Sequence, residues 1–222
     1  MLFRSGRILD HNNVMYQMRL LRAGKNRHNG AYYYAEEIKR NIIPNVRTDR
    51  NWVLVNQQGM CMDHSIVFVH NNMHPQNYEW LSAYDDLVLV CGVYETQQKV
   101  KHLGKTIFLP LSVDVAQVMA HKRPKTKDRA FFGRLNKSKG IEFPEGTDII
   151  EGLPRREFLA RMAEYREVYA VGRTAIEAKI LGCKVLPYDP RYPNPGRWKV
   201  LDNRDAAKML QEKLDKLDGA WR

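Results

Sequence analysis

Four near-continuous apolar runs, rich in β-branched residues, alternate with segments of helical length in the first half of the chain. The runs lie at residues 52–55, 65–69, 86–91 and 106–110. Such runs are typical of parallel strands that are covered on both faces. Between them, residues 75–83 and 94–103 have helical length, and the second segment ends at Gly104, a common helix stop. The order strand, helix, strand, helix, strand predicts a parallel α/β sheet.

A second alternation of the same kind follows a polar, basic stretch. It predicts strands at 130–132, 147–150, 168–171 and 184–187, and helices at 154–165, 174–181 and 203–217. Pro154 suits the first turn of its helix, where the missing N–H costs no hydrogen bond. One more helix is predicted upstream, at residues 31–40, where acids precede bases as the helix dipole favours. We therefore predict an α/β fold with two Rossmann-like lobes, each a parallel sheet with flanking helices.

The basic stretch between the two alternations predicts the domain boundaries. Residues 1–112 form the N-terminal lobe, residues 113–128 a basic linker, and residues 129–222 the C-terminal lobe, which ends in a closing amphipathic helix. Residues 122–127 in the linker are the densest run of cations in the chain. This run is either a contact for a polyanion or a solvated hinge. Two lobes joined in this way are expected to bind a ligand in the groove between them.

Composition narrows the class of protein without identifying it. The 222 residues are 44% hydrophobic, and their formal net charge of +11 favours anionic partners such as nucleotides, DNA or other polyanions, although the cations are also explained as surface charge. Three scattered cysteines indicate reduced thiols in the core. No apolar run approaches the roughly 18 residues that a transmembrane helix needs. These features predict a cytoplasmic protein, and so small a two-lobed chain is a candidate homo-oligomer.

The run from Phe131 to Gly140 carries the first chemical motif. An apolar strand ends there in Gly133, and two cations, Arg134 and Lys139, flank a short turn. Open α/β sheets bind ligands at the carboxyl ends of their strands. The motif therefore predicts a site for a diphosphate between the two cations, with a solvated loop as the alternative.

The second motif runs from Gly172 to Leu186. A glycine opens a helix that carries one carboxylate, Glu177, and a second glycine then leads into an apolar strand. Glu177 is placed to accept hydrogen bonds from ribose hydroxyls, or else it is a surface carboxylate paired with Lys179 or with a neighbouring residue. Thr174, in the first turn of this helix, either caps the helix or binds phosphate. Together the two motifs predict a nucleotide-sugar site.

Both motifs resemble the donor-binding half of the retaining GT-B glycosyltransferases. The pattern Gly-Arg-Leu, three residues, Lys-Gly is similar to the family segment whose Arg and Lys hold the donor diphosphate, and Arg134 and Lys139 occupy those places. Glu177 matches the ribose-binding carboxylate. The resemblance implies two Rossmann-like lobes, the second one reduced, and transfer of a hexose from a nucleoside-diphosphate sugar. It implies no metal and no other cofactor.

The resemblance extends upstream to the proposed acceptor or sugar side of the groove. Asn29–Gly30 resembles the glycine loop that opens the first helix of the family, and residues 65–72 resemble the strand that ends in His and Asn. The resemblance implies that His70 takes part in catalysis and that Gly30, Asn71 and Asn72 line the same groove. His70 and His74 also have the spacing of helical zinc ligands, but Pro75 argues against one helix through both.

The acceptor is not identified by the sequence, and modified DNA or an anionic polymer are the candidates that the basic composition favours. The family often has two glutamates with seven residues between them, but here Tyr169 occupies the first place and Glu167 is the nearest carboxylate. This difference supports an alternative hypothesis, a non-catalytic nucleotide- or nucleic-acid-binding module on a reduced GT-B scaffold. A nucleotide-dependent epimerase of the same architecture is a third hypothesis, for which no catalytic carboxylates are evident.

Overall fold

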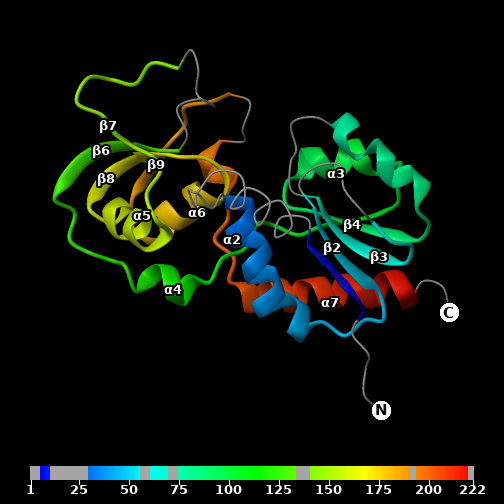
Figure 1. Ribbon diagram of the computed structural model, residues 1–222. Coiled ribbons are helices and arrows are strands. Elements are labelled where there is room, and N and C mark those ends of the chain that lie inside the picture. The colour runs from blue at the N-terminus through cyan, green and yellow to red at the C-terminus, as the bar shows by residue number, and fades with distance from the viewer. Residues whose placement is uncertain are drawn as a thin grey trace, which may run out of the picture. The chain divides into compact units, whose positions relative to one another are not determined.

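The computed structural model describes residues 6–10, 30–55, 61–69, 75–133, 141–190 and 194–219. It has an α/β fold with two sheets of parallel strands flanked by helices, as the apolar runs predicted (Figure 1). The chain divides into two compact units. The first unit contains Met1–Pro110 together with Asn203–Arg222, and the second contains Leu111–Asp202.

The sheet of the first unit has five parallel strands in chain order. They are β1 (Ile8–Asp10), β2 (Asn51–Val55), β3 (Ser65–Val69), β4 (Leu87–Cys91) and β5 (Lys105–Phe108). The four predicted strands are confirmed to within two residues, and β1 is an additional strand whose Leu9 pairs with Val53. Every residue of β3 and of β4 is buried. Burial on both faces explains why these strands form continuous apolar runs in the sequence.

The helices of the first unit are short, with one exception. They are α2 (Gly30–Glu37), the π-helical turn η1 (Ile38–Ile42), the 3-10 turns η2 (Ile43–Asn45) and η3 (Pro75–Ala83), α3 (Tyr94–Val100), and the long helix α7 (Asn203–Gly219). The helix changes from the π type of η1 to the 3-10 type of η2 just before Pro44, which lies in the first turn of η2. Proline has no N–H and its ring crowds the carbonyl four residues earlier, so the α-helical pattern cannot pass through it unchanged.

The core of the first unit forms between the sheet and the segments η3 and α3. Val53, Val67 and Leu89 point to this face, where Tyr78 and Val100 meet them. The alternate positions point to the opposite face and are buried as well; among them, Trp52 stacks on Phe68 with 6.2 Å between ring centroids. Figure 1 shows α3 on one side of this sheet and α2 and α7 on the other.

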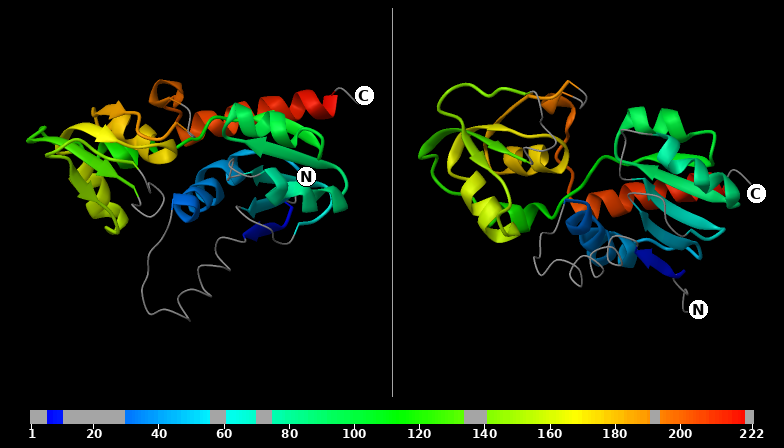
Figure 2. Two further views of the ribbon diagram at one scale, coloured as in Figure 1. Left: turned by 90° about the horizontal axis from the view of Figure 1, so that it is seen from above. Right: turned by 45° about the horizontal axis from the view of Figure 1, so that its top comes forward.

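The long helix α7 packs within the first unit, although the sequence assigned it to the C-terminal lobe. It lies against η1 and η2 (Figure 2). Gln211 bonds both backbone groups of Arg47, accepting from the N–H at 2.6 Å and donating to the carbonyl at 3.3 Å. The buried amide of Asn203 donates to Glu37 Oε2 at 3.0 Å. The amphipathic pattern predicted the helix, but its packing partners lie more than 150 residues earlier in the chain.

The second unit contains a four-stranded parallel sheet and three α-helices among its described residues. The strands are β6 (Lys127–Phe132), β7 (Asp148–Ile150), β8 (Tyr165–Tyr169) and β9 (Lys184–Leu186), in the order β7-β6-β8-β9. The helices are α4 (Val115–Met119), α5 (Arg155–Met162) and α6 (Gly172–Ile180), with a 3-10 turn η5 (Pro195–Arg197). Helix α4 lies in the predicted linker, where the Asp114 side chain caps it by accepting from the Gln117 N–H at 2.9 Å.

The two ends of the second unit are joined by hydrogen bonds. Val113 and Asp202 form a parallel β-bridge, in which the Val113 N–H donates to the Leu201 carbonyl at 3.1 Å. The Asp202 carboxylate also accepts from the Val115 N–H at 3.2 Å. The segments that enter and leave this unit therefore run side by side.

Helices cover one face of the second sheet, and aromatic side chains from loops cover part of the other. Phe132 points toward α5 and meets Phe158 edge to face at 5.2 Å. Phe131 points to the opposite face, where its ring centroid lies 4.7 Å from that of Phe143 and 5.2 Å from that of Tyr188. In Figure 1, α5 and α6 lie on one side of the sheet and the segment that leads into β7 passes over the other. Phe143 thus covers a face that a crossover helix covers in larger α/β proteins.

A polar network ties together the amino ends of the strands in the first sheet. His64 Nδ1 lies 2.6 Å from Asp86 Oδ2, and His64 Nε2 lies 3.2 Å from Asp49 Oδ1. Arg50 Nη1 donates to the same Asp86 oxygen at 3.0 Å. His64 and Asp86 precede β3 and β4 with φ of 53° and 51°, a left-handed conformation uncommon outside glycine. The network lies at the edge opposite the one where α/β sheets bind ligands, so we interpret it as structural.

Asp86 is expected to make the first unit less stable at acid pH. Burial alone would raise the pKa of this carboxyl, but hydrogen bonds from His64 and Arg50 outweigh burial and hold the pKa below its ordinary 3.8. A group with a lowered folded pKa adds stability above its unfolded pKa and loses that stability as the pH falls through the folded value. Urea unfolding midpoints of wild type and Asp86→Asn, measured between about pH 6 and pH 2, test this expectation.

The Asp86→Asn midpoint should be lower than that of wild type near pH 6, and it should decline less steeply in acid. Asp85→Asn is the matched control, because Asp85 is an exposed neighbour that meets His64 through its backbone carbonyl, which accepts from the His64 N–H at 3.0 Å and is kept in the variant. It should keep the wild-type slope. Identical acid slopes for wild type and Asp86→Asn would contradict this account.

Candidate functional site

The carboxyl edge of the second sheet has a topological switch point between β6 and β8. From β6 the chain goes to β7 on one side, and from β8 it goes to β9 on the other side. The segments that follow these two neighbouring strands therefore diverge. Open α/β sheets bind their ligands where such segments diverge. Both predicted motifs begin here, one at the end of β6 and one after β8.

Gly133 directly follows β6, and the packing of Phe131 requires a glycine at this position. A Cβ atom on residue 133 would lie 2.5 Å from the ring atom Cζ of Phe131, which is fully buried. The Gly133 N–H lies 3.4 Å from the Ile150 carbonyl oxygen, to which it donates. The glycine therefore lets the chain turn away from the sheet beside a large aromatic ring. The two predicted diphosphate cations, Arg134 and Lys139, lie outside the described residues.

Helix α6 begins at the switch point with no side-chain cap. Gly172 is its first residue and has a φ of +57°, and Val171 in the N-cap position has no side-chain oxygen to offer. Thr174 lies in the first turn and is partly exposed. The first N–H groups of a helix and the positive end of its dipole attract anions. Thr174 thus lies in the first turn of α6, the position from which the sequence predicted either a cap or a phosphate contact.

Glu177 lies on the buried face of α6, where two arginines enclose it. Its side chain is 1% exposed. Arg155 donates to Oε2 at 2.7 Å and to Oε1 at 2.5 Å, and Arg173 Nε donates to Oε1 at 2.7 Å. The predicted ribose contact needs an accessible carboxylate, whereas both oxygens of this carboxylate accept hydrogen bonds from guanidinium groups. The predicted alternative partner, Lys179, instead donates to the Trp198 carbonyl at 2.7 Å.

The ion pairs keep Glu177 charged in spite of its burial. Burial alone would raise the pKa of this carboxyl, but the charges of Arg173 and Arg155 outweigh burial and lower the pKa from 4.5. Two cations and one anion leave one positive charge near the first turns of α5 and α6. The sequence analysis missed both arginines. Arg173 and Glu177 are four residues apart on a helix, a pairing signal that was available, whereas Arg155 comes from another helix and gave no local signal.

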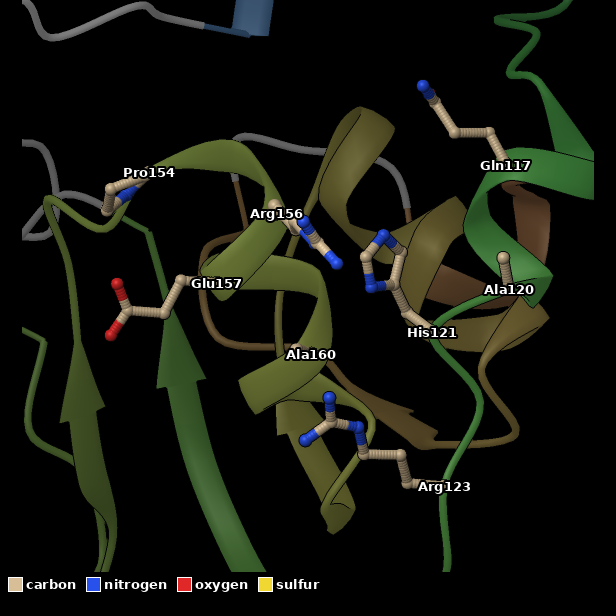
Figure 3. Close-up of a pocket in the computed structure, with 8 residues that line it drawn as sticks. All are labelled: Gln117, Ala120, His121, Arg123, Pro154, Arg156, Glu157 and Ala160. Carbon is tan, nitrogen blue, oxygen red and sulfur yellow. The ribbon is translucent and has the colours of Figure 1, made fainter.

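A pocket opens between α4 and α5 in the second unit, and sequence analysis did not predict it. Figure 3 shows its lining, which consists of Gln117, Ala120, His121, Arg123, Pro154, Arg156, Glu157 and Ala160. Burial lowers the pKa of His121 from 6.5, and the charges of Arg156, Arg123 and Arg155 lower it further. The pocket is therefore a region of positive potential.

The remaining predicted site residues belong to the first unit. Gly30 is the first residue of α2, as the resemblance led us to expect of the glycine that opens this helix. His70, Asn71 and Asn72 lie outside the described residues, as does His74 of the zinc alternative. Of the predicted donor residues, the structure brings Gly133 and Thr174 to segments that follow neighbouring strands, and it encloses Glu177 below them.

In the described ranges no three His, Cys, Asp or Glu side chains gather closely enough to hold a metal ion. No described helix combines the length and apolar character of a membrane span. All three cysteines are buried free thiols in core positions, as predicted, and burial raises the pKa of Cys91 to about 12.

The comparisons with known proteins gave no relative. No family model matches the chain. Searches of curated proteins and of solved structures gave no match either.

Proposed function

We propose that this chain is a GT-B-type glycosyltransferase that takes a sugar from a nucleoside-diphosphate sugar bound at the carboxyl edge of the second sheet. One observation supports the proposal above all. The two segments that resemble the donor-binding part of GT-B enzymes follow β6 and β8, the strands on either side of the switch point. Sequence resemblance and sheet topology thus favour the same position for a nucleotide.

In the proposed complex the donor diphosphate lies at the uncapped first turn of α6. Backbone N–H groups and the Thr174 hydroxyl donate to it from the helix, and Arg134 and Lys139 bring positive charge from the segment after β6. Negative charge grows on the phosphate leaving group as the glycosidic bond breaks, so cations held there stabilise the transition state. Arg134 offers a planar fork of donors and Lys139 a mobile point charge.

Glu177 has a positioning role in this proposal and does not itself contact ribose. Its carboxylate fixes the guanidinium groups of Arg155 and Arg173 beside the first turns of α5 and α6. The ordered arginines add positive potential at the edge where the diphosphate binds. Their order is a form of preorganisation, because the charges need not be rearranged during the reaction.

The first unit supplies the acceptor side in this proposal. His70 serves as the candidate catalytic base, since a histidine titrates near neutral pH, and Gly30, Asn71 and Asn72 contact the sugar or the acceptor. The basic composition favours a hydroxyl on modified DNA or on another anionic polymer as the acceptor. The transfer is proposed to need no metal ion and no cofactor beyond the nucleotide sugar.

A second candidate function, nucleotide binding without turnover, is favoured by the surroundings of Tyr169. This tyrosine occupies the place of the first family glutamate, and its ring packs against Phe143 with 5.2 Å between centroids. Glu167, the nearest carboxylate, is held by Arg129 at 2.8 Å and by Lys184 at 2.8 Å. In this alternative the chain is a binding module on the same scaffold.

Replacing Arg134 with alanine is expected to weaken UDP or GDP binding by about 1–3 kcal/mol, the scale of a lost charged hydrogen bond. Isothermal titration calorimetry of each nucleotide measures the change. Lys137→Ala is the matched control, since Lys137 is a cation of the same segment that the resemblance does not place on the donor. It should bind within about 0.5 kcal/mol of wild type. Equal affinities for Arg134→Ala and Lys137→Ala would reject the donor site.

Turnover separates the two candidate functions. Wild-type protein incubated with a panel of UDP- and GDP-sugars is expected to release free nucleotide, at least by slow hydrolysis, if it is a transferase. The Arg134→Ala variant should release less at equal protein concentration. Tight binding of a nucleotide with no release from any sugar donor would favour the binding module.

A further inference from the structure

We propose that the pocket between α4 and α5 is an anion site that binds a phosphate group through His121, Arg156 and Arg123. This site shares no residue with the proposed donor site and does not depend on glycosyl transfer. Its residues come from the predicted basic linker and from the start of the helix predicted at 154–165.

The first support is the shape and chemistry of the pocket. Three of its lining side chains are basic, and the walls between them are formed by the small residues Ala120 and Ala160 and by Pro154. In Figure 3 the guanidinium group of Arg156 and the imidazole of His121 point toward each other across the pocket, while the carboxylate of Glu157 points away from both. The two side chains that face one another are therefore both basic.

The second support is the lack of a protein anion between these groups. Within the ranges that the structure describes, the side chains of His121 and Arg156 have no hydrogen-bond or ion-pair partner. Arg123 forms an ion pair with Glu164, whose Oε1 lies 3.7 Å from Nη1, so among the described residues the unpaired cations of the pocket are His121 when protonated and Arg156. Clustered like charges repel one another, and that repulsion is removed when an anion binds among them. The cluster thus lowers stability in the unbound protein and favours a bound anion.

The third support is the helix start beneath the pocket. Pro154 and the first-turn residues Arg156 and Glu157 belong to the pocket lining, and Pro154 in the N-cap position gives no side-chain cap. The positive end of the α5 dipole therefore adds to the charge of the side chains. Planar guanidinium groups and N–H donors match the tetrahedral oxygens of phosphate.

Two kinds of ligand carry the required phosphate group. One is a small phosphorylated metabolite, and the other is the phosphodiester backbone of a nucleic acid. Lys122 is exposed next to the pocket and belongs to the basic run 122–127, so a backbone crossing the pocket would meet further cations. The chemistry of recognition is shared, and the experiment below separates the two sources.

In the first measurement, inorganic phosphate is titrated into the wild-type protein and into three variants, Arg156→Ala, His121→Gln and Arg161→Ala. Binding is measured by calorimetry or by NMR of the histidine ring protons. Arg156→Ala is expected to weaken phosphate binding by roughly tenfold or more, as expected for a lost charged hydrogen bond. Arg161→Ala is the matched control, because Arg161 lies on the same helix, carries the same charge and is outside the pocket lining. It should leave the affinity unchanged.

The second measurement compares binding of a short DNA duplex by wild type and Arg156→Ala across a salt series. If nucleic acid supplies the phosphate, the variant should lower the slope of log affinity against log salt by about one. A weakened phosphate affinity with an unchanged DNA slope supports the same site with a small phosphorylated ligand. Phosphate affinities that agree among wild type, Arg156→Ala and His121→Gln would overturn the proposal.

A pH series with sulfate gives a readout that a purely structural role would not change. Burial and the charges of Arg156, Arg123 and Arg155 lower the pKa of His121 and so oppose its protonation. A bound dianion favours the protonated ring, so sulfate affinity should rise as the pH falls from about 7.5 to 5, because the pKa of His121 in the unbound protein lies below its ordinary 6.5. The rise should be absent in His121→Gln. A rise that persists in that variant, with phosphate affinity also unchanged, would count against the site.

Discussion

Replacement of Glu177 with alanine is expected to lower the free energy of unfolding of the second unit by about 3–5 kcal/mol, the usual cost of removing one partner from a buried charge cluster. The substitution leaves the Arg155 and Arg173 guanidinium groups close together without the carboxylate that accepts from both. Arg173 is 10% exposed, so water compensates its charge poorly. The midpoint of urea unfolding, followed by circular dichroism, measures the loss.

A matched pair of controls separates this effect from helix propensity. Glu157→Ala makes the same chemical change at an exposed position of α5 and should cost less than about 0.5 kcal/mol. Adding Arg173→Ala to Glu177→Ala should restore part of the lost stability, since the two changes act on one ion pair. A midpoint for Glu177→Ala equal to that of Glu157→Ala would show that the cluster adds nothing to stability.

Phe143→Ala should have the second-largest effect, about 2–3 kcal/mol, somewhat below the 3–5 kcal/mol typical of a fully buried phenylalanine. Its ring packs against three other rings on the face of the second sheet that the helices leave uncovered. The distances between ring centroids are 4.7 Å to Phe131, 5.2 Å to Tyr169 and 6.0 Å to Tyr188. Truncation would expose the Phe131 ring to water. Unfolding by urea again gives the change in free energy.

Phe143→Leu and Tyr94→Ala serve as the comparison variants for this aromatic cluster. Leucine keeps most of the apolar volume and should cost less than about 1.5 kcal/mol. Tyr94 is 58% exposed and touches one ring, Phe108, so its truncation should change stability little. If Phe143→Ala were as stable as Tyr94→Ala, the loop would not be part of the core of this unit.

Burial explains which elements the sequence predicted well. Strands β2, β3 and β4 are covered on both faces, so nearly every position is apolar and the runs stand out. Helix α6 was predicted from a glycine at each end, and both glycines have positive φ, Gly172 at +57° and Gly182 at +77°. The apolar runs and the terminal glycines are local signals, since each depends on the residue type and on the burial or backbone conformation of that one position.

Other elements depend on contacts that no local pattern contains. Helix α4 has five residues and precedes a basic run, so only the capping residue Asp114 marked its start. The three residues of β1 are too few for a periodic pattern. The sequence showed that Glu177 lies on a helix at the ligand edge, but it could not show that Arg155, 22 residues earlier, would occupy its carboxylate. For the same reason the sequence analysis assigned α7 to the wrong lobe. The apolar stripe of α7 shows that the helix packs against something, but it does not show that η1 and η2 are the segments it packs against.

The β-bridge between Val113 and Asp202 brings the entrance and exit of the second unit together, so this unit is inserted into the first like a loop with a closed base. During synthesis on the ribosome, residues 111–202 emerge complete before α7 does. Until then the buried isoleucines of η1 lack the helix that lies against them. The unit begun first is therefore the one finished last, and a truncation within the seventeen-residue helix α7 would destabilise a unit whose five strands all lie before residue 110.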